Sequence, residues 1–332
     1  MTPSDSKIVI SASRRTDIPA FYLDWFMQRM ELGSFEVVNP YNGRVSVVPA
    51  TPENVHTVVF WSKNFGPFLS AGAGDRLQRC GYHLFFNFTL NSRHTRLEPH
   101  VPPLPERIRQ LETLCRQFDP RSVNWRFDPV CFYTVGNGRM LNNLNDFEAI
   151  AVHASKMGIV RCITSFMDPY AKIRKRLKPG STFSFVDPPL DIKQKTLQDM
   201  SDILRDLRIE LQVCCEKDVL NGLPAQAGIT GSSCVPNDLL KTLYGGNIST
   251  RLDRGQRIGQ GCGCKVSVDI GSYRDQPCYH NCLFCYANPV DPPQGRREYR
   301  EKNQTKTTKT GELLETPDAK EAKRRASIRI ER

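Results

Sequence analysis

The sequence lacks the long apolar run that a membrane-spanning helix needs, since no stretch of about 18 apolar residues occurs among its 332 residues. It also lacks a basic start followed by an apolar stretch, so we expect no secretory signal and a cytoplasmic location. The composition, 39% hydrophobic and 24% charged, excludes disorder along the whole chain. We therefore expect a globular protein that makes no contact with a membrane.

Lysine and arginine exceed aspartate and glutamate by a net charge of +11, but no basic block typical of a nucleic-acid-binding arm occurs. The excess predicts a solvated basic surface, which leaves nucleic-acid binding as the less favoured alternative. Anionic substrates or cofactors also agree with this charge.

Twelve cysteines are too few for a small disulfide scaffold of this length. Without a secretory signal the thiols should be reduced, so cysteines that cluster indicate a metal site. Eight of the twelve cysteines fall in two groups near the C-terminal end of the sequence. The other four are isolated and are expected to be packing residues: Cys80, Cys115, Cys131 and Cys162.

Residues 1–216 alternate β-rich runs with longer stretches of helical spacing, a pattern typical of βαβ units and a parallel sheet. The predicted class is α/β, with a partial (β/α)6-type TIM-like barrel. The expected strands are Ile8–Ser13, Thr57–Ser62, His83–Leu90, Ser122–Phe127, Val160–Phe166 and Glu210–Cys215. The expected helices are Phe21–Leu32, Glu106–Phe118, Asp146–Met157 and Leu190–Leu207.

Two further parts follow this barrel. Residues 217–290 are rich in glycine and cysteine and contain one short strand candidate, Lys265–Ile270. We expect this segment to complete the site by binding a cluster. Residues 291–332 are polar and are expected to form a disordered tail with one frayed helix around Pro317–Ile330.

Polar and apolar residues alternate along several expected strands, which gives each strand two different faces. In the third strand Leu84 and Phe86 share one face, and Asn87 and Asn91 share the other. A polar face on repeated parallel strands predicts a lumen lined for a ligand, with the apolar face packed on helices. The alternative is an antiparallel sheet wetted on one side, which the intervening helices disfavour.

Charged and polar residues stand where the expected strands end. In parallel barrels the functional groups gather at the carboxyl ends of the strands, so these residues are site candidates. For any one of them, the alternative is an ion pair that braces a loop. The candidates are Arg14, Arg15, Asp17, Asn91, Arg126, Asp128 and Glu216.

The most specific signal is the run from Cys278 to Cys285, in which Cys282 is the middle of three cysteines. Three cysteines at spacings of four and three can bind three corners of one iron–sulfur cube. A structural zinc site requires four protein ligands, usually in separated pairs. Three thiolates therefore leave one iron of the cube without a protein ligand. A reactive metal site needs such an open position.

This spacing resembles the motif of the radical S-adenosylmethionine (SAM) superfamily, and the motif's aromatic position falls on Phe284. The resemblance implies that Cys278, Cys282 and Cys285 hold a 4Fe–4S cluster whose fourth iron binds SAM. One-electron reduction then cleaves SAM, usually to methionine and a deoxyadenosyl radical. The resemblance also implies that Phe284 packs on the adenine and that a flavodoxin- or ferredoxin-type protein donates the electron. It gives His280, inside the loop, no role.

The motif stands late in this chain, whereas radical SAM enzymes usually carry it after the first barrel strand. Because Lys265–Ile270 precedes it, the layout suggests a circular permutation in which the first strand follows the cluster loop in space. Over about residues 7–290 the chain also resembles an uncharacterised bacterial family with a radical-SAM-like cysteine cluster at its C-terminus. That family supplies no known reaction. The shared stretches are Ser11–Pro19, Phe60–Asn64, Trp125–Pro129, Cys262–Cys264 and Ser267–Asn288.

The groups that SAM presents suggest roles for the candidates at the strand ends. A guanidinium suits the carboxylate of SAM, so Arg126 is the first choice and Arg15 the second. The ribose hydroxyls suit Asn91, Asp128 or Glu216. Arg14 and Asp17 are assigned to the substrate. Tyr286, which follows the motif, is assigned to the cofactor.

A second group of cysteines predicts another metal site. Cys262 and Cys264 flank a single glycine, so their thiols can reach one metal. With Cys234 and Cys214 they would form a four-thiolate site for an auxiliary iron–sulfur cluster or a structural zinc. Cys214 is chosen over Cys215 because it shares the polar strand face with Glu216. Ordinary buried thiols are the alternative.

The predicted function is therefore a radical SAM-type enzyme acting on an unknown small molecule or peptide. Because Tyr286 follows the motif, the sequence also resembles spore photoproduct lyase-like DNA repair enzymes, which is the first alternative. The second is a zinc-ribbon-like structural or nucleic-acid-binding protein without catalysis. Iron content and a brown colour distinguish the first two hypotheses from the third.

Overall fold

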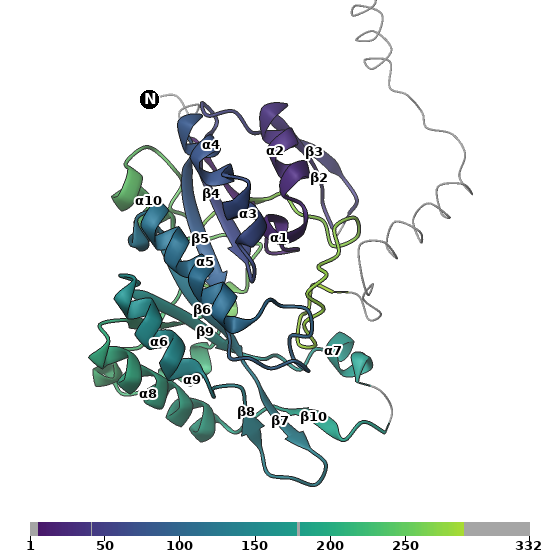
Figure 1. The fold of residues 1–332 in the computed structure, drawn as a ribbon, viewed down its shortest axis with the longest axis vertical. Coiled ribbons are helices and arrows are strands. Elements are labelled where there is room, and N and C mark those ends of the chain that lie inside the picture. The colour runs from purple at the N-terminus through teal and green to yellow at the C-terminus, as the bar shows by residue number, and fades with distance from the viewer. Residues whose placement is uncertain (1–5, 41, 178–179, 289–332) are drawn as a thin grey trace, which may run out of the picture. The chain divides into compact units, whose positions relative to one another are not determined.

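The computed structural model describes residues 6–40, 42–177 and 180–288. At its centre is an eight-stranded sheet in the order β12-β11-β9-β6-β5-β4-β1-β13, in which all neighbours run parallel (Figure 1). The strands are β1 (Ile8–Ala12), β4 (Val55–Ser62), β5 (His83–Thr89), β6 (Val123–Val130), β9 (Arg161–Phe166), β11 (Glu210–Val213), β12 (Thr230–Gly231) and β13 (Val268–Asp269).

The predicted α/β class is confirmed, and all six expected strands of the first part occur in the sheet. The short candidate Lys265–Ile270 contains β13, which pairs with β1 in parallel register. The sequence pattern did not indicate β12. Two smaller antiparallel sheets accompany the main one, formed by β2 (Ser34–Val38) with β3 (Val45–Pro49), and by β7 (Phe132–Val135) with β8 (Leu141–Asn142) and β10 (Phe183–Val186).

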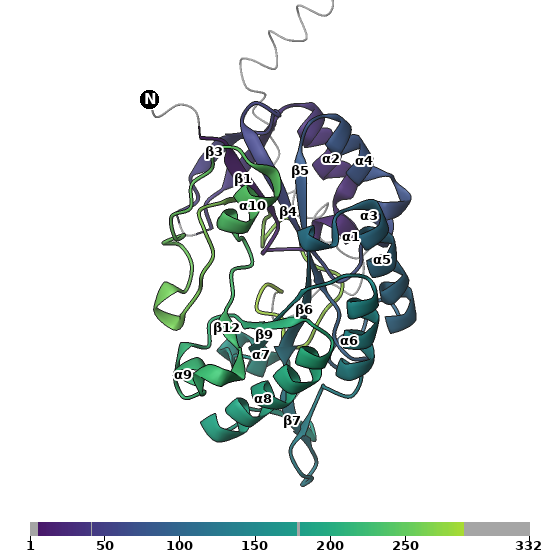
Figure 2. The ribbon, with the colours of Figure 1, turned by 90° about the vertical axis from the view of Figure 1, so that its left-hand side faces the viewer.

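Each expected helix has a counterpart, and a short separate helix, Ile18–Phe21, stands just before the first of them. Helices α3, α5, α6 and α8 lie along one face of the main sheet (Figure 2). In α8 the apolar side chains of Leu197, Met200 and Leu204 recur at helical spacing and are buried in the core below the sheet. The helices are α1 (Ile18–Phe21), α2 (Leu23–Glu31), α3 (Gly66–Ser70), α4 (Ala73–Arg79), α5 (Leu104–Gln117), α6 (Phe147–Lys156), α7 (Ala171–Arg176), α8 (Leu190–Asp206), α9 (Lys217–Asn221) and α10 (Asn237–Tyr244).

The two faces of β5 differ as the alternation predicts. Leu84, Phe86 and Phe88 belong to the main core on the helix side. Asn87 points to the other face, where its amide donates to the carbonyl oxygen of Cys234 at 2.9 Å. This amide is fully buried, because the segment after β12 packs over it. The polar face at Asn87 is therefore covered by protein, where the sequence predicted a lumen lined for a ligand.

The TIM-like part of the prediction goes further than the structure, since β12 and β13 are the two edges of the sheet in the described residues. The segments beside these edges are nevertheless joined. The backbone amide of Gly263 donates to the oxygen of Ser232 at 3.1 Å, and that of Lys265 donates to Val235 at 3.0 Å. The segment leading to β13 thus returns to the strand edge that carries β12.

The described residues all belong to one compact unit, which spans residues 1–292. The predicted tail over 291–332 and its helix around Pro317–Ile330 lie outside the described residues. None of the helices that the structure describes is long and apolar enough to cross a membrane.

Candidate metal centres

The cysteine loop, residues 271–288, lies across the carboxyl ends of the first strands and runs from beside α1 toward α7 (Figure 1). Its contacts reach segments that follow three strands. His280 contacts Asp17, which follows β1, and Phe284 lies against Lys63, which follows β4. The amide of Leu283 donates to the oxygen of Leu97, in the loop after β5, at 2.8 Å. The strand ends and the cysteine motif are thus brought together.

Asp17 joins the loop to the sheet through four hydrogen bonds. Its carboxylate accepts from the backbone amides of Ala20 and Lys63 at 3.0 and 2.9 Å and from the hydroxyl of Ser62 at 2.7 Å. The fourth partner is Nε2 of His280, at 2.9 Å. Asp17 was predicted to face the substrate, but it is buried and holds the cysteine loop in place. His280, which received no role from the sequence, is its partner.

Cations on α7 hold the other end of the loop by binding its carbonyl oxygens. Arg176 Nη1 donates to the oxygen of Cys282 at 3.3 Å, and its Nη2 donates to that of Asn288 at 2.6 Å. Lys172 Nζ donates to the oxygen of Tyr286 at 3.1 Å. The loop is therefore fixed from both sides, and the three cysteines are carried on a defined backbone.

The three motif thiols interact with one another through their charges. Burial raises the pKa of the Cys278 thiol, and the charges of Asp17, Cys282 and Cys285 add to this effect. The thiols are thus within electrostatic range of one another. They do not gather within 4.8 Å, however, as three other cysteines of the described chain do. Thiolates that bind different irons of a cube stand farther apart than the ligands of one ion.

A buried ion pair lies directly beside the motif. Lys63 Nζ is 2.7 Å from Glu98 Oε1, and both side chains are almost fully buried. Burial alone would raise the pKa of Glu98, but the positive charges of Lys63 and Arg107 lower it. Lys63 also stands 5.3 Å from the centre of the Phe284 ring. Sequence reasoning missed Glu98, because it lies in an irregular loop without any motif.

Arg14 and Arg15 brace β1 against β13. Asp269 accepts from the backbone amide of Arg14 at 2.8 Å and from the hydroxyl of Ser13 at 2.6 Å. Arg15 Nη1 donates to the oxygen of Gly271 at 2.9 Å, at the start of the cysteine loop. These contacts agree with the alternative that the sequence left open, namely polar pairs that support the loops.

The structure brings Arg126, Asp128 and Asn91 together. Arg126 pairs with the carboxylate of Asp128, and its Nη1 contacts Cys234 Sγ at 3.2 Å. Asn91 Oδ1 accepts from the amide of Asp128 at 2.8 Å.

Glu216 follows β11 and accepts from the amide of Phe166 at 2.9 Å. Burial raises the pKa of Glu216 to about 7.

The second cysteine group forms one cluster, which we call the thiol cluster. Cys214, Cys215 and Cys262 have their sulfurs within 4.8 Å of one another, and the Cys214–Cys215 distance is 3.5 Å. Cys234 interacts with Cys214 and Cys264, and Cys264 also interacts with Cys262. The four predicted cysteines therefore do come together. Cys214, the preferred member of its pair, belongs to the tight group, and Cys215 belongs to it as well.

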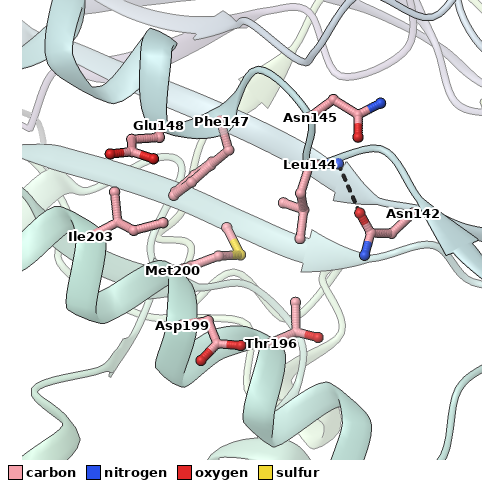
Figure 3. A pocket seen from close by; sticks show the side chains of 9 residues that line it. All are labelled: Asn142, Leu144, Asn145, Phe147, Glu148, Thr196, Asp199, Met200 and Ile203. Carbon is pink, nitrogen blue, oxygen red and sulfur yellow. Dashed lines mark hydrogen bonds between the residues drawn. The ribbon is translucent and has the colours of Figure 1, made fainter.

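Two surface pockets lie outside both cysteine groups. One has a volume of about 230 Å³ and lies between α6 and α8, where Phe147 and Met200 form part of its wall (Figure 3). It contains none of the predicted site residues. The other, about 200 Å³, is lined by Asp168 and Tyr170, which follow β9, and by Arg257, which follows α10. The ring of Tyr170 lies 6.1 Å from that of Tyr286, so this pocket borders the cysteine loop.

Comparison with known proteins places the chain in a family and gives little beyond that. No curated protein matches it. It is weakly similar to the crystal structure of D-hydantoinase (10% identity, TM-score 0.29, 62% of this chain and 46% of that chain). It is also weakly similar to the carboxyl transferase domain of Rhizobium etli pyruvate carboxylase with 3-bromopyruvate (10% identity, TM-score 0.21, 69% of this chain and 40% of that chain). It thus spans less than half of either structure. The model of the domain of unknown function DUF1848 matches residues 9–287, and the chain belongs to that family.

Proposed function

We propose that this protein is a radical SAM-type iron–sulfur enzyme whose core is circularly permuted. The observation that carries the proposal is the place of β13. This strand directly precedes the cysteine loop and pairs in parallel with β1, although some 250 residues separate them, as in the pair Ile10 and Val268. The cysteine motif therefore follows the strand that stands before β1 in the sheet. In the proposed permuted core, β13 is the first strand in space, and the motif follows it directly.

The residues that would hold the cluster are Cys278, Cys282 and Cys285. A cluster bound at three corners supplies one electron to a ligand on its open iron. The chain's own contribution is to fix the loop and keep its thiols away from water. Asp17 and His280 anchor the first half of the loop, and the second half is buried among apolar side chains such as Phe284.

The charge around the motif is mixed, because the carboxylates of Asp17 and Glu98 lie near its thiols together with Lys63. Lys63 stands beside Cys282 and Phe284. The exposed face of Tyr286 borders the pocket of Asp168, Tyr170 and Arg257, which offers both charge signs to SAM or to a substrate. An electron donor of the flavodoxin or ferredoxin class would supply the electron.

A second candidate is a protein that binds metal without catalysis. It rests on the thiol cluster, because Cys214, Cys215 and Cys262 gather as the ligands of one ion do. In this case all the C-terminal cysteines would be structural.

Incubation of anaerobically reconstituted, dithionite-reduced protein with SAM tests the first candidate. We expect brown, iron-containing protein that releases methionine and 5′-deoxyadenosine. Methylthioadenosine would instead indicate transfer of the aminocarboxypropyl group. Cys278→Ala, Cys282→Ala and Cys285→Ala should each abolish turnover, whereas Cys80→Ala, at an exposed isolated cysteine, should leave it unchanged. Unchanged iron content in the three motif variants would refute the proposal.

A further inference from the structure

The thiol cluster is assembled from three separate parts of the chain. Cys214 and Cys215 directly follow β11, and Cys234 follows β12. Cys262 and Cys264 stand a few residues before β13. Cys234, Cys262 and Cys264 are buried together with Ile163, and Cys214 and Cys215 are partly buried against them. Such a concentration of reduced thiols in a protein interior is a metal-ligand set.

We propose that the thiol cluster binds one tetrahedral divalent cation of the zinc type, with Cys214 and Cys262 among its four ligands. Each of these two thiols interacts with three of the other four, whereas the remaining thiols each interact with two. They are therefore the first choice as ligands. Cys215 adopts a left-handed backbone conformation, with φ +61°, which is rare for a residue with a side chain. Residues in such strained conformations cluster at functional sites, so the backbone of Cys215 supports a binding role for the thiol cluster.

The spacing of the sulfurs distinguishes one ion from an iron–sulfur cube. Zinc–sulfur bonds of about 2.3 Å in a tetrahedron place neighbouring sulfurs about 3.8 Å apart. The sulfurs of Cys214 and Cys215 are 3.5 Å apart, and both lie within 4.8 Å of Cys262 Sγ. The thiolates around a cube bind different irons, so the cube itself would have to fit between them. The separations of these three sulfurs match the ligands of one ion.

Two arginines supply the positive charge that a thiolate site needs. A divalent cation with four thiolates carries a net charge of −2. Arg126 contacts Cys234 Sγ at 3.2 Å, and the guanidinium of Arg14 lies near Cys264. Both guanidinium groups also stand over the ring of Trp61, with their central carbons at 5.3 Å for Arg14 and 5.1 Å for Arg126. Arg14 Nη2 and Arg126 Nε are buried without a hydrogen-bond partner among the described residues and can donate to thiolate sulfurs.

The position of the site in the fold gives the ion a structural role. β12 and β13 are the two edges of the described sheet. An ion shared by Cys214 and Cys262 would join the β11–β12 edge to the segment that leads into β13. Only two backbone hydrogen bonds, from Gly263 and Lys265, otherwise link Ser232–Val235 to this segment in the part of the chain that the structure describes. The ion would thus position β13 and the cysteine loop that follows it.

Metal analysis of the full chain, produced in medium containing both zinc and iron and purified without chelator, tests this assignment. We expect about one zinc per chain that resists brief EDTA treatment, as closed sites do. Cys262→Ser should lower bound zinc at least fivefold. Cys162→Ser, at a buried cysteine outside both groups, should retain it. The triple variant Cys278→Ala, Cys282→Ala, Cys285→Ala should also retain it, which makes the result independent of SAM chemistry.

Cobalt substitution gives a second measurement on the unaltered chain, in case Cys262→Ser fails to fold. Protein loaded with Co²⁺ should show the intense visible bands of a tetrahedral four-thiolate site. Zinc-free protein, or cobalt bands typical of six-coordinate oxygen ligation, would overturn the proposal. So would a loss of four irons per chain in Cys262→Ser, because that result assigns the thiol cluster to a second cube.

Discussion

Asp17 illustrates how one buried carboxylate connects three parts of this protein. It caps α1, binds the start of the segment after β4 and accepts from His280 of the cysteine loop. The sequence shows only an aspartate near a strand end, and such a residue can equally face a substrate. What decides its role is His280, which is 263 residues away in the chain.

Asp17→Asn should therefore loosen the cysteine loop. The asparagine side chain has one oxygen where aspartate has two, so at least one hydrogen bond from a buried donor is lost. The expected cost is about 1–3 kcal/mol in the free energy of unfolding. Denaturant unfolding followed by fluorescence measures this cost. The exposed Asp24→Asn on α2 is the matched control and should change stability little. Equal effects of the two substitutions would contradict the role given to Asp17.

The ion pair of Lys63 and Glu98 leads to a second prediction at this scale. Lys63→Met leaves the Glu98 carboxylate buried without its main partner, which should destabilise the fold by about 3–5 kcal/mol. The double variant Lys63→Met, Glu98→Gln removes both charges and should recover a large part of this loss. A double-mutant cycle on unfolding free energies tests it. Strictly additive losses would mean that the two charges do not act as a pair.

At the scale of elements, the amino-terminal ends of β4 and β5 meet α10 through aromatic rings. His83 stacks on Tyr244 with ring centres 4.4 Å apart, and His56 lies 5.1 Å from His83. Burial lowers the pKa of both histidines below the ordinary value, and the charge of Lys7 adds to the effect for each. Neutral rings thus hold α10 against the sheet.

This arrangement predicts how stability changes with pH. Below pH 6.5 the unfolded chain takes up protons at these histidines more readily than the folded chain does, so stability falls as the pH is lowered from 7 toward 5. His83→Phe keeps the stacking on Tyr244 and removes one titrating group. Its stability should fall less over this range, by about 0.5 kcal/mol given the partial exposure of His83. Unfolding curves at pH 7 and pH 5 measure this, and parallel declines would contradict it.

The elements were the part of the structure that the sequence predicted best. Alternation along Leu84–Phe88 and helical spacing along Leu197–Leu204 are local patterns, and burial follows them directly. β12 has only two residues and exists through its pairing with β11, so no local pattern could reveal it. Glu98 and His280 were missed for the same reason, because their roles come from partners that are distant in the sequence.

At the scale of the whole molecule, the order of strands in space differs from their order in the chain. The sheet runs through β1, β4, β5, β6, β9, β11 and β12 in sequence, and β13 then returns to the far side of β1. The late position of the cysteine motif, directly after a strand candidate, is the feature of the sequence that indicates this return. At β5, protein fills the place of the predicted ligand-lined lumen, since Asn87 is buried and donates to the oxygen of Cys234.

The electron paramagnetic resonance spectrum of the reduced, reconstituted protein, recorded with and without SAM, tests the central claim most directly. A 4Fe–4S cluster held by Cys278, Cys282 and Cys285 with one open iron should give a reduced-state signal that shifts when SAM is added. Cys278→Ala should lose this signal, and Cys80→Ala should keep it. A cluster signal that SAM leaves unchanged, or a reduced protein without a cluster signal, would contradict the account.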